Sequence, residues 1–170
     1  MKLKNNLGLI GMMGAGKSTI GKVVAKKMNL KFIDTDDEIT KLEKKSIRKI
    51  FELYGEKYFR EKEEKIITKL LDKDQVVIAY GGGSFLNREI RRNILDNSMS
   101  FWLSWKKNTI IKRIITNYKR PKVINLTKKD LSDMIDSRSN IYQQADHKID
   151  CENLNKNEIA EKIISLYNNE

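Results

Sequence analysis

The sequence predicts an α/β fold in three layers, in which a five-stranded parallel sheet is covered by helices on both faces. Short apolar runs alternate with amphipathic segments along the 170 residues, and a glycine-rich turn joins the first of each. Three unusual loops each follow a predicted strand. Because the carboxyl ends of parallel strands share one edge of a sheet, we expect these loops to form one ligand site there.

The strands are predicted where short apolar runs lie between turn signals, as in buried parallel sheets. The clearest run is Gln-Val-Val-Ile-Ala at residues 75–79, and the others are residues 7–10, 31–33, 99–103 and 147–151. Apolar residues at helical spacing predict helices over residues 18–28, 37–44, 47–54, 56–71, 87–95, 109–115, 128–144 and 156–167. Asp36, Ser46 and Thr127 are the expected N-caps of the helices that follow them, and Gly55 is expected to end the third helix.

Length and composition favour one folded domain over residues 1–170. A chain of this size buries roughly 70% of its unfolded surface, and 39% of the residues are hydrophobic while 34% are charged. The single cysteine, Cys151, cannot form an intrachain disulfide. No apolar run approaches the ~18 residues that span a membrane. We therefore expect a cytoplasmic protein without a membrane partner.

The formal charge of +11 raises the question of nucleic acid. Residues 97–129 hold no acidic residue but nine basic ones, namely Lys106, Lys107, Lys112, Arg113, Lys119, Arg120, Lys122, Lys128 and Lys129. Such a stretch should meet phosphates, either of a nucleotide or of a polynucleotide. Tyr118 is its only aromatic residue between 106 and 129, which leaves little surface for stacking bases. We expect no nucleic-acid partner.

Residues 11–19 read Gly-Met-Met-Gly-Ala-Gly-Lys-Ser-Thr and fit the P-loop pattern G-x-x-x-x-G-K-[ST] between a strand and a helix. Glycines let backbone N–H groups turn toward phosphates, and the helix N-terminus adds partial positive charge. Lys17 would reach the β- and γ-phosphate oxygens, and Ser18 would bind Mg²⁺. The predicted nucleotide contacts of this loop are Gly14, Ala15, Gly16, Lys17, Ser18 and Thr19. The alternative is a glycine-rich turn without a ligand.

The two other loops carry Asp34-Thr35-Asp36 and Gly81-Gly82-Gly83. Asp36 could serve only as an N-cap. Three glycines at the end of a strand indicate either a structural turn or a close approach of something to the backbone.

These motifs together resemble the shikimate kinase family. The resemblance rests on the P-loop, Asp34–Asp36, Phe59-Arg60 followed by E-x-E, G-G-G-S at residues 81–84, Arg120-Pro121, and Arg138 with Tyr142 four residues later. The motifs stand in the family's order and cover essentially the whole chain. The resemblance implies a fold of the P-loop NTPase type with a mobile lid at about 116–127 and substrate-binding helices at about 35–62. It also implies that ATP and Mg²⁺ serve to phosphorylate the 3-hydroxyl of shikimate, in aromatic amino acid biosynthesis, by a monomeric enzyme.

The resemblance implies roles for particular residues as well. Arg60 and Arg138 would hold the substrate carboxylate, together with backbone near Gly82. Asp36 would bind the ring hydroxyls and is the candidate base. Asp34 would lie near the metal beside Ser18. Arg113 would pack against the adenine, and Arg120, the lid arginine, would join Lys17 at the transferring phosphoryl group.

The sequence also allows other interpretations of these residues. Arg60, four residues before Glu64, and Arg138 could form ordinary helix ion pairs. The chain could be another P-loop kinase similar to gluconate kinases, or a non-catalytic, nucleotide-responsive binding protein. The family usually has other residue types where this chain has Tyr80, Lys122 and Asn140. The residues His147, Cys151, Trp102 and Trp105 are expected to be core or surface residues without a role in the site.

Overall fold

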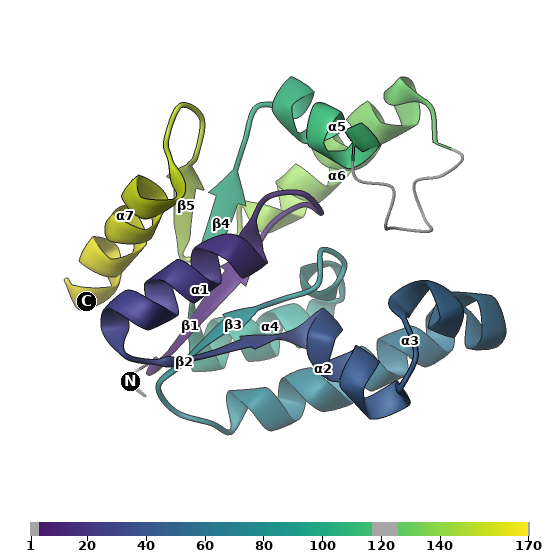
Figure 1. Ribbon diagram of the computed structural model, residues 1–170, viewed down its shortest axis with the longest axis horizontal. Coiled ribbons are helices and arrows are strands. Elements are labelled where there is room, and N and C mark those ends of the chain that lie inside the picture. The colour runs from purple at the N-terminus through teal and green to yellow at the C-terminus, as the bar shows by residue number, and fades with distance from the viewer. Residues whose placement is uncertain (1–3, 117–125, 170) are drawn as a thin grey trace.

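The computed structural model describes residues 4–116 and 126–169. Five parallel strands form one sheet in the order β2–β3–β1–β4–β5, with helices on both sides of it (Figure 1). The strands are β1 (Asn6–Ile10), β2 (Lys31–Asp34), β3 (Val76–Ala79), β4 (Ser98–Ser104) and β5 (His147–Asp150). The predicted fold class is confirmed. β1 lies at the centre of the sheet and is buried along its whole length.

The helices follow the predicted order, and two of them cover the same face as a pair. α1 and α7 lie side by side on one face of the sheet, whereas α4 lies on the other (Figure 1). The bounds are α1 (Lys17–Met28), α2 (Thr35–Glu43), α3 (Ile47–Leu71), α4 (Arg88–Asn97), α5 (Lys107–Thr116), α6 (Lys128–Tyr142) and α7 (Lys156–Asn168), with a 3-10 turn η1 (Ser84–Leu86). Gly55 interrupts α3 with φ 77° and ψ 177°, so the predicted break between two helical segments is present.

The N-cap of α2 differs from the prediction. Asp34, not Asp36, caps this helix, because the Asp34 carboxylate accepts a hydrogen bond from the backbone N–H of Asp36 at 3.0 Å. β2 runs into α2 without an intervening loop, which places Asp36 in the first helical turn. The interpretation of Asp36 as only an N-cap is therefore wrong. The caps at Ser46 and Thr127 are confirmed.

A second, smaller hydrophobic cluster lies away from the sheet. Ile39 of α2 and Ile50 and Phe59 of α3 bury their side chains against one another. Ile66 packs against this cluster and against the main core. The helices at residues 35–62 therefore have an apolar core that is largely their own.

The predicted lid at 116–127 falls mostly outside the described residues, as does Arg120. The last residue of α5 is Thr116, and Thr127 caps α6. Within residues 4–116 and 126–169, no helix combines the length and the apolar character that crossing a bilayer requires.

Tyr80, one of the departures from the family pattern, points into the core rather than into the loops. Its hydroxyl lies 3.4 Å from the Ser98 hydroxyl, and burial raises the pKa of this phenol. A Cβ atom at Gly8 would lie 2.8 Å from the Tyr80 ring. The glycine in the central strand thus makes room for the large ring on the neighbouring strand's end.

We expect Gly8→Ala to lower the free energy of unfolding by about 1–3 kcal/mol, since overpacking a core forces its side chains to shift. Urea unfolding followed by circular dichroism measures this loss. In a Tyr80→Ser background the loss should shrink, because the ring that collides with the new methyl group is gone. An equal loss in both backgrounds would contradict this explanation.

Candidate active site

The three predicted loops meet at the carboxyl edge of the sheet, and Thr35 joins two of them. Its buried hydroxyl accepts a hydrogen bond from the Gly81 N–H at 2.9 Å and donates to the Ala79 carbonyl at 3.3 Å. The start of α2 is thereby tied to the end of β3. Sequence reasoning gave Thr35 no role, although it stands between the two aspartates that were singled out.

The P-loop curves from β1 into α1 through backbone conformations that favour glycine. Gly14 has φ 79° and Gly16, the N-cap of α1, has φ 87°. Lys17 is 8% exposed, and its ammonium donates to the carbonyl oxygens of Gly11 at 2.8 Å and Met12 at 2.9 Å. The lysine therefore lies inside the curve of its own loop. Its contact with phosphates stays a prediction.

Ser18 and Asp34, the predicted metal ligands, are brought together. The Ser18 hydroxyl donates to one carboxylate oxygen of Asp34 at 2.5 Å, and the other oxygen of Asp34 caps α2. A hydroxyl and a carboxylate are hard oxygen donors of the kind that Mg²⁺ prefers, in sites that phosphate oxygens complete. The two side chains fit a magnesium ion.

The glycines at 81 and 83 leave room for side chains that pack on the turn. A Cβ atom at Gly81 would lie 2.8 Å from the Asp36 carboxylate and 2.7 Å from Glu63. One at Gly83 would overlap the Arg60 guanidinium. The glycine turn thus brings Asp36 of α2 and Arg60 of α3 close to one stretch of backbone, and a larger residue at either glycine would push them away.

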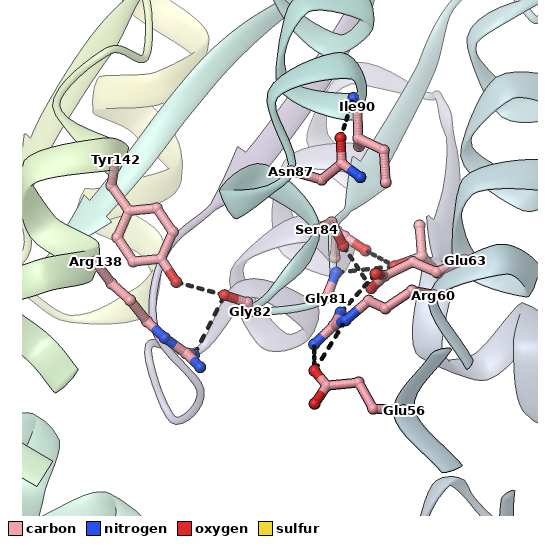
Figure 2. Close-up of polar contacts among 12 residues, drawn as sticks. Glu56, Arg60, Glu63, Gly81, Gly82, Ser84, Asn87, Ile90, Arg138 and Tyr142 are labelled. Carbon is pink, nitrogen blue, oxygen red and sulfur yellow. Dashed lines mark hydrogen bonds and ion pairs between the residues drawn. The ribbon is translucent and has the colours of Figure 1, made fainter. Parts of the chain in front are cut away.

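Arg60 is held by two carboxylates on its own helix (Figure 2). Its Nη1 lies 2.6 Å from Glu63 Oε2, and its Nη2 lies 3.3 Å from Glu56 Oε1. The buried Glu63 also accepts a hydrogen bond from the Ser84 hydroxyl at 2.7 Å. The ion pairs expected for Arg60 do exist, but with Glu56 and Glu63 rather than with Glu64.

Charge and burial act in opposite directions on this pair. Burial raises the pKa of the Glu63 carboxyl, although Arg60 and Ser84 counteract it. Burial lowers the pKa of Arg60, but the neighbouring glutamates outweigh it and the net direction is upward. The arginine therefore stays charged, and its ion pair with the buried Glu63 fixes its position. Glu63 belongs to the E-x-E that follows Arg60, yet sequence reasoning gave it no role.

Arg138 and Tyr142 of α6 approach the glycine turn from the opposite side to Arg60 (Figure 2). Both side chains donate to the Gly82 carbonyl, Tyr142 at 2.5 Å and Arg138 at 3.5 Å. A Cβ atom at Gly82 would lie 3.2 Å from the Met13 nitrogen of the P-loop. The two predicted substrate arginines thus flank one glycine turn that itself rests on the P-loop.

Arg113, the predicted adenine contact, lies on α5 beside the P-loop. Its Nη1 is 3.4 Å from the Gly14 carbonyl, and its guanidinium carbon is 3.7 Å from the centre of a Trp105 ring. Trp105 in turn donates from Nε1 to the Ala15 carbonyl at 3.0 Å. Trp105 packs against the core as predicted, but the expectation that it has no partners beside the site is wrong, because it contacts both Ala15 and Arg113. Its place just after β4, next to the central strand, is the signal that could have indicated this contact.

A five-stranded parallel sheet with a P-loop after the central strand, beside loops that bring arginines and aspartates together, defines a P-loop kinase. A family model described as "Shikimate kinase" matches residues 13–168. The chain belongs to the shikimate kinase family, as the sequence motifs predicted.

Curated relatives and solved structures agree with this assignment. Shikimate kinase of Caldicellulosiruptor bescii is 38% identical over 163 residues, which are 95% of this chain and 95% of the relative. That of Persephonella marina is 35% identical over 159 residues, 94% and 96% of the two chains. The structure of shikimate kinase from Acinetobacter baumannii in complex with shikimate has a TM-score of 0.91 at 27% identity, covering 97% of this chain and 93% of that one. The Aquifex aeolicus enzyme has a TM-score of 0.83 at 32% identity, covering 96% and 97%.

A gluconokinase from Sinorhizobium meliloti is similar in fold alone, with a TM-score of 0.59 at 11% identity. This similarity extends over 99% of the chain and 94% of that structure. It gives no support to the gluconate-kinase alternative beyond the shared architecture.

Proposed function

We propose that this protein transfers the γ-phosphoryl group of ATP to the 3-hydroxyl of shikimate, giving shikimate 3-phosphate and ADP, in aromatic amino acid biosynthesis. Membership of the shikimate kinase family carries the proposal. The gathering of Asp36, Arg60 and Arg138 around a glycine turn beside the P-loop supports it.

The substrate carboxylate would bind between Arg60 and Arg138, with the backbone near Gly82. Guanidinium groups form charge-assisted, paired hydrogen bonds to a carboxylate. Glu56 and Glu63 hold Arg60 in a fixed orientation, so less side-chain freedom is lost when the substrate arrives. The Arg138 guanidinium, on the other side of the turn, would complete the clamp.

Asp36 would accept hydrogen bonds from ring hydroxyls and take the proton of the hydroxyl that attacks. A base must lie within hydrogen-bond reach of the proton that it accepts. The closeness of the Asp36 carboxylate to Gly81 supports this role, because the same glycine turn adjoins Arg60, Arg138 and the P-loop. Its backbone N–H bond to Asp34 fixes the turn that carries it.

On the nucleotide side, the backbone of residues 14–19 would bind the phosphates, and Lys17 would exchange its two loop carbonyls for phosphate oxygens. Ser18 and Asp34 would hold Mg²⁺, which when bound neutralises charge on the phosphates. Arg113 would contact the base. Arg120, which lies outside the described residues, would reach the transferring phosphoryl group from the lid at about 116–127, and closure of that lid would exclude water.

We further propose that the protein acts as a monomer in the cytoplasm, as one domain, without a nucleic-acid or membrane partner. The composition supports the absence of a nucleic-acid partner. Much of the net charge of +11 comes from lysine, and Tyr118 is the only aromatic residue between 106 and 129 on which a base could stack. Size-exclusion chromatography with light scattering and a filter-binding assay with RNA would test the two parts separately.

The test of the function is ADP release by the purified protein with ATP and Mg²⁺, in the presence of shikimate, gluconate, quinate or no acceptor. We expect strong stimulation by shikimate alone. Stimulation by gluconate would favour the other kinase class. No stimulation by any acceptor, with retained ATP binding, would favour a non-catalytic nucleotide-binding protein.

Arg138→Ala is expected to raise KM for shikimate by about 10- to 100-fold, because a charge-assisted hydrogen bond contributes roughly 1.5–3 kcal/mol. KM for ATP should change less than about twofold, as the side chain lies on the glycine turn. Initial-rate kinetics with each substrate varied in turn measure both. Arg92→Ala is the matched control, since Arg92 is exposed on α4 and pairs only loosely with Asp96 at 3.7 Å. An equal loss for both substrates would assign Arg138 to the nucleotide or to the fold.

A further inference from the structure

Trp105 and Arg113 form a face-on stack beside the P-loop. The guanidinium carbon of Arg113 lies 3.7 Å from the centre of a Trp105 ring, a separation that only contact through the ring face allows. Cation–π attraction is strongest for tryptophan and grows when water is excluded from the contact. The indole therefore covers one face of the guanidinium group and fixes the orientation of its plane.

Trp105 and Arg113 also donate hydrogen bonds to two successive carbonyl groups of the P-loop. Trp105 Nε1 donates to Ala15 O at 3.0 Å, and Arg113 Nη1 lies 3.4 Å from Gly14 O. In a trans peptide unit the carbonyl and the following N–H point in opposite directions. The bond from Trp105 thus also turns the Gly16 N–H away from the indole. That N–H is one of the donors predicted to bind phosphate.

Glu152 fixes the segment that carries this stack. Its carboxylate accepts hydrogen bonds from the Lys106 N–H at 3.1 Å and from the Thr109 hydroxyl at 2.9 Å. Lys106 directly precedes α5 and Thr109 lies in its first turn, so both donors lie between Trp105 and Arg113 in the sequence. The stack is thus attached at one end to the P-loop and at the other to the loop that follows β5.

We propose that Trp105 is a positioning residue for the nucleotide, which holds the Arg113 guanidinium as a platform for the base and orients the peptide between Ala15 and Gly16 for the phosphates. The proposal rests on the proposed function, because it takes ATP as the ligand. A guanidinium plane stacks on any aromatic ring, and the stack adjoins the loop that binds the phosphates. A planar base linked to those phosphates is the group that such a platform fits.

Two variants separate the two parts of the proposal. Trp105→Phe keeps an aromatic face but removes the N–H, whereas Trp105→Leu removes both. Isothermal titration with ADP and with inorganic tripolyphosphate, which has no base, measures the two contributions. We expect Trp105→Leu to weaken the affinity for ADP about 10-fold, because a partly desolvated stack is lost. The affinity for tripolyphosphate should fall by about threefold, because the hydrogen bond from the indole N–H is lost. Trp105→Phe should lower the affinity for both ligands by that same threefold factor.

Trp102→Phe is the matched control, because Trp102 is 8% exposed and packs on Tyr142, 6.2 Å between ring centres, rather than on Arg113. It should leave ADP affinity within about twofold of the unchanged protein. ADP affinity of Trp105→Leu within that same margin, in a variant with normal circular dichroism, would overturn the proposal.

A fluorescence measurement covers the case in which Trp105→Leu does not fold. The chain has 2 tryptophans, so the Trp102→Phe protein reports on Trp105 alone. We expect its emission to change when ADP is added, and not when shikimate is added. An unchanged emission at saturating ADP would overturn the proposal. If ADP binding depends on Trp105 but shikimate is not phosphorylated, the proposed function fails and the role of Trp105 stands.

Discussion

Lys17→Ala is expected to lower kcat/KM for ATP by about a thousandfold, because it removes a positive charge from the site where charge develops on the phosphates. In the structure Lys17 is buried, and its ammonium donates to the carbonyls of Gly11 and Met12. Bulk water therefore cannot easily replace the lost ammonium group in the variant. ADP release in the presence of shikimate measures the effect.

Lys26→Ala provides the control for this variant. Lys26 is exposed on the same helix, so its replacement removes the same charge from the protein without touching the loop. Its kcat/KM should stay close to that of the unchanged protein. Near-normal turnover by Lys17→Ala would contradict the P-loop assignment, whereas a comparable loss in both variants would point to net charge.

Asp36→Asn is expected to lower kcat by about 10²–10⁴-fold, the usual contribution of a positioned general base. Asparagine keeps the size of the side chain and one oxygen acceptor, but it cannot take a proton. KM for shikimate should therefore change by less than about tenfold, since the bonds to ring hydroxyls are mostly kept. Single-turnover measurements with each variant separate the chemical step from binding.

Asp37→Asn removes the same charge one residue further along α2, where the side chain is exposed. We expect it to keep most of the activity. If the kcat of Asp36→Asn is unchanged, the base lies elsewhere. If KM rises and kcat does not fall, Asp36 binds substrate but does not accept the proton.

The sheet and its helices could be predicted because each element has a local signal. The run at residues 75–79 and the apolar spacing of α7 are each readable within one segment. The cap of α2 could not be assigned in the same way. Both Asp34 and Asp36 have a side chain that can cap a helix, and only the direct passage from β2 into α2 makes Asp34 the acceptor.

The contacts that were not predicted join residues far apart in the chain. Trp105 and Ala15 are separated by 90 positions, and Glu63 and Ser84 by 21. The periodicity and spacing of residue types do not predict such contacts, because they depend on how the ends of neighbouring strands are placed in space. The motifs indicated which loops converge, but not which side chains hold them in place.

The small cluster of Ile39, Ile50 and Phe59 has a consequence for evolution. These residues pack α2 against α3, and they meet the core under the sheet mainly through Ile66. Substitutions among them can shift the helices that carry Asp36 and Arg60 while the strands and the P-loop keep their packing. Given the proposed roles of Asp36 and Arg60 in binding the acceptor, we expect a descendant of this enzyme to change its acceptor molecule through this cluster while natural selection preserves the P-loop.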